Sequence, residues 1–99
     1  MLVVREVFHC KPGKVRGLVE KFQAVNNASE KLGLGSARLM TDLSGERFWT
    51  VVSEWEVESL QAFEDLMRKS MESKELAEVM KGYHDYIDHG RREVFTIVS

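Results

Sequence analysis

The sequence RFWTVVSEW, at Arg47–Trp55, carries large apolar side chains at both odd and even positions. Side chains alternate between the two faces of a β-strand. One face would carry Trp49, Val51 and Trp55, and the other would carry Phe48 and Val52. A strand that is open to water on one side is apolar on the other side only. We therefore predict a central strand that is covered on both faces.

The segments on either side of this strand predict the order β-α-β-β-α-β. We expect strands at residues 2–10, 36–43, 47–57 and 92–98. Apolar residues at three- and four-residue steps after Pro12 predict a helix that ends near Gly33. Residues 44–46 would join two strands in a hairpin. Ser59 and Ser73 would begin two helical pieces, the second of which ends at Gly90.

Two right-handed β-α-β units of this kind build a four-stranded antiparallel sheet with its helices on one face. The expected fold class is therefore α+β and ferredoxin-like, with residues 1–99 as a single domain. Helices from a chain of 99 residues cover one face of this sheet. We expect a second copy of the chain to cover the other face, which gives a homodimeric α+β barrel.

Composition excludes several broad classes of function. A formal net charge of −2 with 43% hydrophobic and 30% charged residues is typical of a globular protein and untypical of a nucleic-acid-binding module. No apolar run reaches the length needed to cross a membrane. The single cysteine, Cys10, cannot form a disulfide within the chain, which favours a cytoplasmic location.

Three stretches resemble known proteins. They are KPGK at residues 11–14, EWE followed by SLQAF within residues 54–63, and GRREVF at residues 90–95. The last resembles the closing strand of NIPSNAP-like proteins, and the others resemble both these proteins and the antibiotic-biosynthesis-monooxygenase group. The resemblance implies a dimeric α+β barrel whose two sheets enclose a lumen. That superfamily includes cofactor-independent oxygenases, isomerases, haem-degrading enzymes and proteins without a known reaction.

Cofactors are not expected. The resemblance to the haem-degrading group implies an iron-binding histidine seven residues after a serine, but the frame that starts at Ser73 places Met80 there. His84, about one helical turn later, is the alternative haem ligand. His84 and His89 are five residues apart and do not share a helical face, so we predict no metal site.

Polar residues on otherwise apolar strands are the candidate site. The candidates for the lumen are Glu6, Phe8, Arg38, Met40 and Glu54, together with His84. A buried carboxylate needs a partner, so Glu6 or Glu54 would pair with Arg38 or Arg92. Two interpretations stay open. The charged groups bind a polar-headed ligand or tune a general base, or they form an ion-pair layer that sets the register of the dimer.

The predicted function is therefore that of a dimeric protein that binds a small apolar or aromatic molecule, as a cofactor-independent monooxygenase or isomerase. The alternative is a non-catalytic dimer that binds a ligand or a partner protein. Because one fold serves many functions, the sequence leaves open whether the protein is an enzyme.

Overall fold

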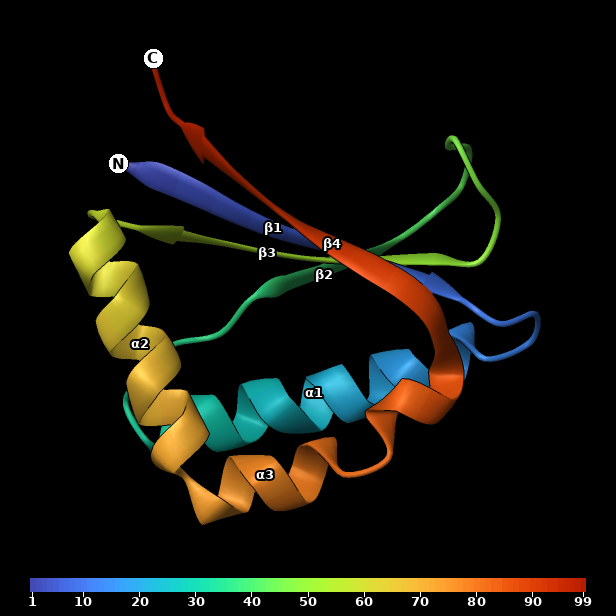
Figure 1. Ribbon diagram of the computed structural model, residues 1–99, viewed down its shortest axis with the longest axis horizontal. Coiled ribbons are helices and arrows are strands. Elements are labelled where there is room, and N and C mark those ends of the chain that lie inside the picture. Colours follow the sequence, from blue (N-terminus) through green and yellow to red (C-terminus); the bar gives the residue numbers. More distant parts are fainter.

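The computed structural model describes residues 1–99 and confirms an α+β, ferredoxin-like fold (Figure 1). Its elements are β1 (Leu2–Cys10), α1 (Val15–Lys31), β2 (Arg38–Thr41), β3 (Thr50–Val57), α2 (Leu60–Glu72), α3 (Lys74–Met80), the 3-10 helix η1 (Tyr83–Tyr86) and β4 (Ile87–Thr96). None of these helices is long and apolar enough to cross a membrane.

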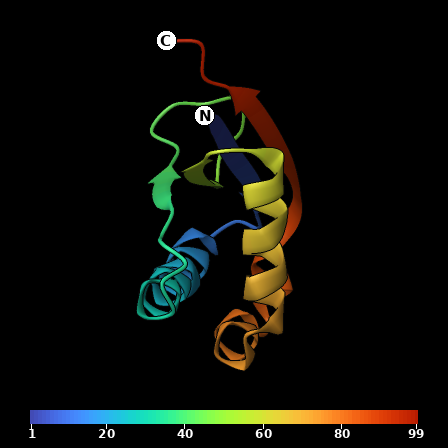
Figure 2. The same ribbon diagram turned by 90° about the vertical axis from the view of Figure 1, so that its left-hand side faces the viewer.

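The four strands form one antiparallel sheet in the order β2-β3-β1-β4. All helices lie on one side of it (Figures 1 and 2), and we call the opposite side the open face. The two central strands pair in a register that places Phe8 opposite Val51. Even-numbered residues of β1 and odd-numbered residues of β3 therefore face the helices, and the intervening residues lie on the open face.

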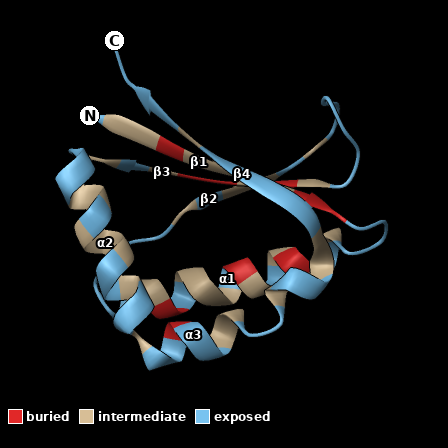
Figure 3. Cartoon of the chain, in the orientation of Figure 1, coloured by how far each residue is buried: buried red, intermediate tan, exposed pale blue.

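The core lies between the sheet and α1. Its centre consists of Cys10, Leu18, Phe22 and Val51, all buried. The rings of Phe8 and Phe22 pack at 5.1 Å between centroids. Figure 3 shows the buried residues gathered mainly on the central strands and α1. The predicted amphipathic helix is thus confirmed, with its apolar stripe against the sheet.

The second helical region breaks where the sequence predicts. The hydroxyl of Ser59 accepts a hydrogen bond from the backbone N–H of Ala62 at 3.1 Å and begins α2. The hydroxyl of Ser73 accepts from the backbone N–H of Leu76 at 3.2 Å and begins α3. Each serine satisfies an N–H that the helix itself leaves without an acceptor. The bend at Ser73 lets the two helices run in different directions.

The central strand is shorter than predicted. It begins at Thr50 rather than at Arg47, and Phe48 is 84% exposed. Trp49 has a left-handed φ of 62°, which interrupts the alternation of a strand. The Asp42 carboxylate accepts a hydrogen bond from the Thr50 backbone N–H at 2.8 Å and closes the 42–49 loop. The predicted tight turn at residues 44–46 is therefore a longer loop, and β2 is limited to four residues.

Gly90 was predicted to end a helix, and this is wrong because it lies within β4. That strand begins at Ile87 rather than at residue 92. Gly90 pairs with Phe8, and a Cβ at this position would lie 3.0 Å from Phe8 Cδ1 and 3.1 Å from the Val7 carbonyl oxygen. The strand needs glycine there because its backbone passes close to β1.

Candidate functional site

A pocket of about 480 Å³ lies between the helices and the sheet. Most of the side chains that line it are apolar. α2 begins after Ser59, next to the sheet, and runs away from it toward α3. In Figure 2, α1 and α2 lie on opposite sides of the space beneath the sheet. Leu66 and Met67 of α2 line the pocket together with Phe22 and Val25 of α1. Its size and apolar lining are those of a small-molecule site.

Three polar side chains on the sheet line this pocket: Glu6, Ser53 and Trp55. Glu6 and Ser53 are direct neighbours in the pairing of β1 with β3, and Trp55 follows on the same face of β3. Ser53 is buried. Alternation along the two strands thus places a carboxylate, a hydroxyl and an indole on one surface.

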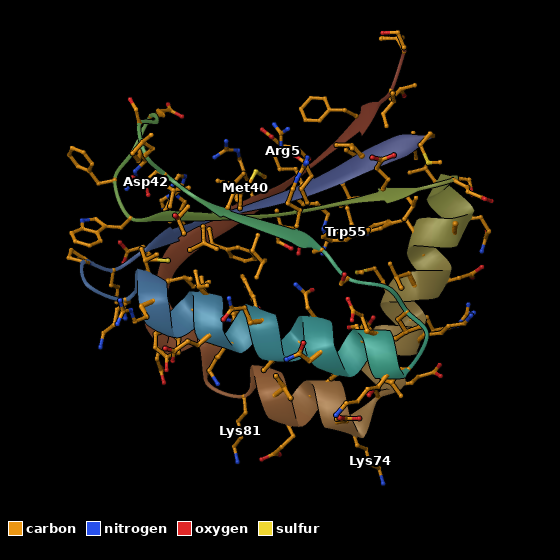
Figure 4. All side chains as sticks on the ribbon, turned by 180° about the vertical axis from the view of Figure 1, so that it is seen from behind. Arg5, Met40, Asp42, Trp55, Lys74 and Lys81 are labelled. Atoms are coloured by element: carbon orange, nitrogen blue, oxygen red, sulfur yellow. The ribbon has the colours of Figure 1, made fainter.

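Trp55 lies on the helix side of the sheet (Figure 4). Its Nε1 is the one buried side-chain nitrogen or oxygen without a hydrogen-bond partner in the molecule. The indole packs against Phe63 of α2, with the ring centroids 6.3 Å apart. A buried donor without an acceptor costs about 1–3 kcal/mol. Nε1 is inaccessible to solvent, so an acceptor on a bound molecule would remove that cost only after a shift of the indole ring.

Glu6 is held by an arginine at the edge of the pocket. Arg92 of β4 donates from Nε to Glu6 Oε2 at 2.8 Å, and its Nη2 donates to the same oxygen. Glu6 Oε1 takes part in no hydrogen bond. The guanidinium of Arg92 also lies 5.2 Å from the centre of the Phe63 ring. The pocket therefore has an oriented carboxylate with one oxygen free to accept a proton or a hydrogen bond.

The six residues predicted to line one lumen are divided among three places. Glu6 and Phe8 face the helices, where Glu6 lines the pocket and Phe8 packs in the core. Arg38, Met40 and Glu54 lie together on the open face. His84 lies in η1, where its ring contacts that of Tyr83 at 4.0 Å between centroids. A single surface that contains all six does not form, because β1 pairs its even-numbered residues with odd-numbered residues of β3, whereas β2 pairs even with even. Even-numbered residues of β1 therefore face the opposite way from those of β2 and β3.

The open face carries a polar groove of about 450 Å³. At its centre, Arg5 donates from Nε to Glu54 Oε2 at 2.9 Å, and Arg38 donates from Nη2 to Glu54 Oε1. The hydrogen bonds from Arg38 and Arg5 hold the pKa of Glu54 below its ordinary value of 4.5, against the opposing effect of burial. Of the pairings that the sequence left open, those of Glu54 with Arg38 and of Glu6 with Arg92 are present.

The residues of the apolar pocket do not suit haem iron. Met80 lines the pocket, whereas His84 does not. Within the chain, no group of three or more His, Cys, Asp or Glu side chains could hold a metal ion. What the pocket lining does offer is an apolar wall, one carboxylate (Glu6), one carboxamide (Asn26), the indole of Trp55 and four serines, at positions 29, 36, 53 and 70.

Sequence reasoning missed Ser53 and left open whether Trp55 packs in the core or forms a wall of a ligand cavity. The signal was present, since Val51, Ser53 and Trp55 share one face of the strand and Val51 is fully buried. What the sequence does not reveal is that α2 diverges from the sheet and leaves space over Ser53 and Trp55. In the sequence, the only sign of that space is a small residue, Ser53, close to the large Trp55 on the same face of the strand.

No protein-family profile matches this chain, and no curated protein matches it. Solved structures do. An uncharacterised NIPSNAP domain protein from Burkholderia xenovorans has a TM-score of 0.83 at 18% identity, with 100% of this chain and 96% of that chain covered. A NIPSNAP family protein from Agrobacterium tumefaciens has a TM-score of 0.85 at 14% identity, with coverage of 99% and 93%.

An antibiotic biosynthesis monooxygenase has a TM-score of 0.72 at 13% identity, with 100% of each chain covered. At these identities the likeness concerns the fold and not the activity. The chain therefore has the fold shared by NIPSNAP-family proteins and antibiotic-biosynthesis-monooxygenase-like proteins, as its sequence motifs implied.

Proposed function

We propose that this protein binds a small, mostly apolar molecule that carries a hydrogen-bond acceptor, in the pocket between the sheet and the helices. The observation that carries the proposal is the buried Nε1–H of Trp55, which has no acceptor in the molecule. Apolar walls supply the affinity for the body of the ligand, and the indole orients its polar end. Aromatic ketones, quinones and phenols have this combination of groups.

The finer proposal is a cofactor-independent monooxygenase or isomerase. It is supported by the unoccupied oxygen of Glu6, next to Ser53 on the pocket surface. A carboxylate in this position would take a proton from an acidic O–H or C–H of the bound molecule. The alternative, supported by the lack of any further titratable group on the sheet side of the pocket, is a non-catalytic ligand-binding protein.

We also propose that the open face packs against a second copy of the chain. Only 11 of 99 residues are buried in a single chain, which is a small core for a protein of this length. Val7 and Val52 pair at the centre of the open face, and Phe95 on the same face is 48% exposed. The ion pairs around Glu54 would then set the register between the two sheets.

Ligand binding can be tested with two probes of similar shape, 2-acetylnaphthalene, which has an acceptor, and 2-ethylnaphthalene, which has none. The two tryptophans, Trp49 and Trp55, give two indole N–H signals in NMR. We expect the ketone to shift the Trp55 signal downfield and to bind roughly tenfold more tightly than the hydrocarbon. Trp55→Phe should remove that preference, and Trp49→Phe should keep it. Equal binding of both probes to the unaltered protein would refute the role of Trp55.

Turnover is tested separately with 1-naphthol in air. A monooxygenase would put one oxygen atom of O2 into the ring and release the other as water, with the naphthol supplying the electrons, to give 1,4-naphthoquinone. Glu6→Gln should stop this reaction while 2-acetylnaphthalene still binds. Binding without turnover would favour the non-catalytic alternative.

The dimer is tested by sedimentation velocity at micromolar concentration. We expect a dimer, and we expect Phe95→Glu on the open face to give a monomer that is still folded by circular dichroism, because Phe95 is exposed in the single chain. A matched change on an exposed helix position, Gln23→Glu, should leave the dimer intact. A monomeric unaltered chain would refute this part of the proposal alone, because the ligand pocket lies within one chain.

A further inference from the structure

Two histidines and two arginines meet at one end of the open face, beside the 42–49 loop. The ring of His9 on β1 lies 4.8 Å from that of His89 on β4, measured between centroids. Arg91 Nη1 lies 3.3 Å from His9 Nε2, and Arg47 Nη1 lies 2.8 Å from His89 Nε2. His9 is buried although it is polar.

The chemistry of the partners gives the direction of these hydrogen bonds. A guanidinium can only donate, so Nε2 of each histidine is the acceptor of the arginine beside it. His9 therefore carries its proton on Nδ1 and donates to the Thr50 hydroxyl at 3.2 Å. That hydroxyl donates in turn to the Arg47 carbonyl at 3.0 Å. Burial, and then Arg47, His89 and Arg91, lower the pKa of His9 against a weaker opposing effect of Glu46, in agreement with a neutral ring.

The same groove holds a second pair of arginines, and both of these form ion pairs with a single carboxylate. Arg5 and Arg38 each bind a different oxygen of Glu54. At the other end, Arg47 forms no ion pair, and Arg91 has a single one, from Nε to Glu93 at 3.1 Å. Charged donors bind charged acceptors about twice as strongly as neutral ones. The donors of Arg47 and Arg91 that contact imidazole nitrogens therefore lack a charged acceptor.

The remaining carboxylates of this region do not saturate them. Asp42 accepts from the backbone N–H of Thr50. Glu46 lines the groove but makes no ion pair. Arg47 and Arg91 thus line a groove that measures about 450 Å³ in the single chain. In the proposed dimer the second sheet would cover this groove, so a small ligand here would lie between the two sheets.

We propose that this end of the open face binds an oxyanion, such as a carboxylate or phosphate group of a small ligand, between the guanidiniums of Arg47 and Arg91. The planar fork of a guanidinium matches two oxygens of such a group. The anion would replace the imidazole nitrogens as the acceptor of these guanidinium donors. The site lies on the opposite side of the sheet from the apolar pocket and does not depend on it.

The experiment follows the three histidine ring signals by 1H–13C NMR at pH 7.5 during a titration with sodium sulfate, with sodium chloride holding the ionic strength constant. Sulfate does not titrate in this range, and His84 lies in η1, outside the cluster, as an internal reference. We expect saturable shifts of His9 and His89 and none of His84. A parallel titration with sodium acetate tells whether the site prefers a tetrahedral oxyanion or a carboxylate.

Two variants that each remove one positive charge distinguish binding at a specific site from a general electrostatic attraction between the protein and the anion. Arg47→Gln should weaken binding roughly tenfold, the loss expected for one charge-assisted contact. Arg38→Gln, in the same groove but paired to Glu54, should change the affinity by less than about twofold. Circular dichroism confirms that both variants fold.

Linear shifts of all three histidines, or equal losses in the two variants, would overturn the proposal. The titration uses the protein in its native assembly. A second copy that covers the cluster would appear as an absence of any saturable shift, and that result would overturn the proposal as well.

Discussion

The ring of Tyr86 packs so closely on Gly17 that a Cβ at position 17 would lie 2.5 Å from Tyr86 Cε1. Gly17 lies inside α1, where alanine is favoured over glycine by about 1 kcal/mol. Tyr86 is half-buried and packs on the core, so its ring has little room to move. We expect Gly17→Ala to lower the free energy of unfolding by about 1–2 kcal/mol in urea, since overpacking outweighs helix propensity.

The control for this change is Asn27→Ala in the same helix. Asn27 is exposed, so the substitution tests helix propensity alone, and a gain of a few tenths of a kcal/mol is expected. If Gly17→Ala stabilises the protein as Asn27→Ala does, the contact between Tyr86 and Gly17 is looser in solution than in the structure.

The elements of the fold could be predicted because their signals are local. The apolar stripe of α1 and the capping serines at 59 and 73 can be recognised from residues within one or two helical turns in the sequence. The errors concern Trp49 and Gly90, whose conformations depend on distant partners. The carbonyl of Trp49 accepts from the Cys10 N–H at 2.8 Å, and Gly90 lies against Phe8. No pattern within either segment contains those contacts.

The site was harder to predict for a related reason. Both faces of the central strands mix apolar and charged residues, so alternation groups Glu6 with Phe8 and separates them from Arg5 but does not say which group faces the helices. The pairing of Glu54 with Arg38 followed from the cost of a buried charge. The convergence of His9 with His89 requires the register of β1 with β4, which composition does not reveal.

Glu54 should matter more for stability at neutral pH than in acid. Its pKa is lowered by hydrogen bonds from Arg38 and Arg5, so its stabilisation is fully present above 4.5 and is lost as the pH falls through the lower folded-state pKa. We expect Glu54→Gln to cost about 1–3 kcal/mol at pH 7 in urea unfolding. The difference between the two proteins should shrink below pH 4.5.

The matched change for this test is Glu56→Gln, two residues along the same strand and exposed, which should cost less than about 0.5 kcal/mol. A Glu54→Gln loss that stays constant from pH 7 to pH 3 would contradict the ion-pair account, because it would show an effect of side-chain shape.

His9 should weaken the fold as the medium becomes mildly acidic. Its pKa in the folded protein is below the ordinary value of 6.5, chiefly because of burial and the charge of Arg47. Below pH 6.5 the unfolded chain therefore binds a proton that the folded chain does not, and stability falls until the pH drops below the folded-state pKa. His9→Gln should remove this part of the decline between pH 7.5 and pH 5.5 in urea unfolding.

His84→Gln, outside the cluster, should leave the slope of stability against pH unchanged over the same range. If the stability difference between the unaltered protein and His9→Gln does not vary with pH, His9 takes up its proton equally in both states, and the neutral assignment of its ring is wrong.

Asn26 joins α1 to the start of β2 through two hydrogen bonds. Its Nδ2 donates to the Ala37 carbonyl and its Oδ1 accepts from the Ala37 N–H, each at 2.9 Å. Both residues line the apolar pocket. Because Asn26→Ala leaves the two backbone groups without partners, we expect a loss of about 1–3 kcal/mol in urea and faster hydrogen exchange at the Ala37 amide.

The adjacent Asn27→Ala is again the control, since it removes the same side chain one position away at an exposed site. Asn26→Asp separates the two bonds, because the carboxylate keeps the acceptor for the Ala37 N–H and loses the donor. At low pH, the stability of Asn26→Asp should lie between those of Asn26→Ala and Asn27→Ala. At pH 7 Asn26→Asp should be less stable than at low pH, because its charged carboxylate then faces the Ala37 carbonyl. Weaker binding of 2-acetylnaphthalene by Asn26→Ala would show that this wall shapes the pocket. Stability and exchange equal to those of Asn27→Ala would mean that the loop before β2 holds its position without Asn26.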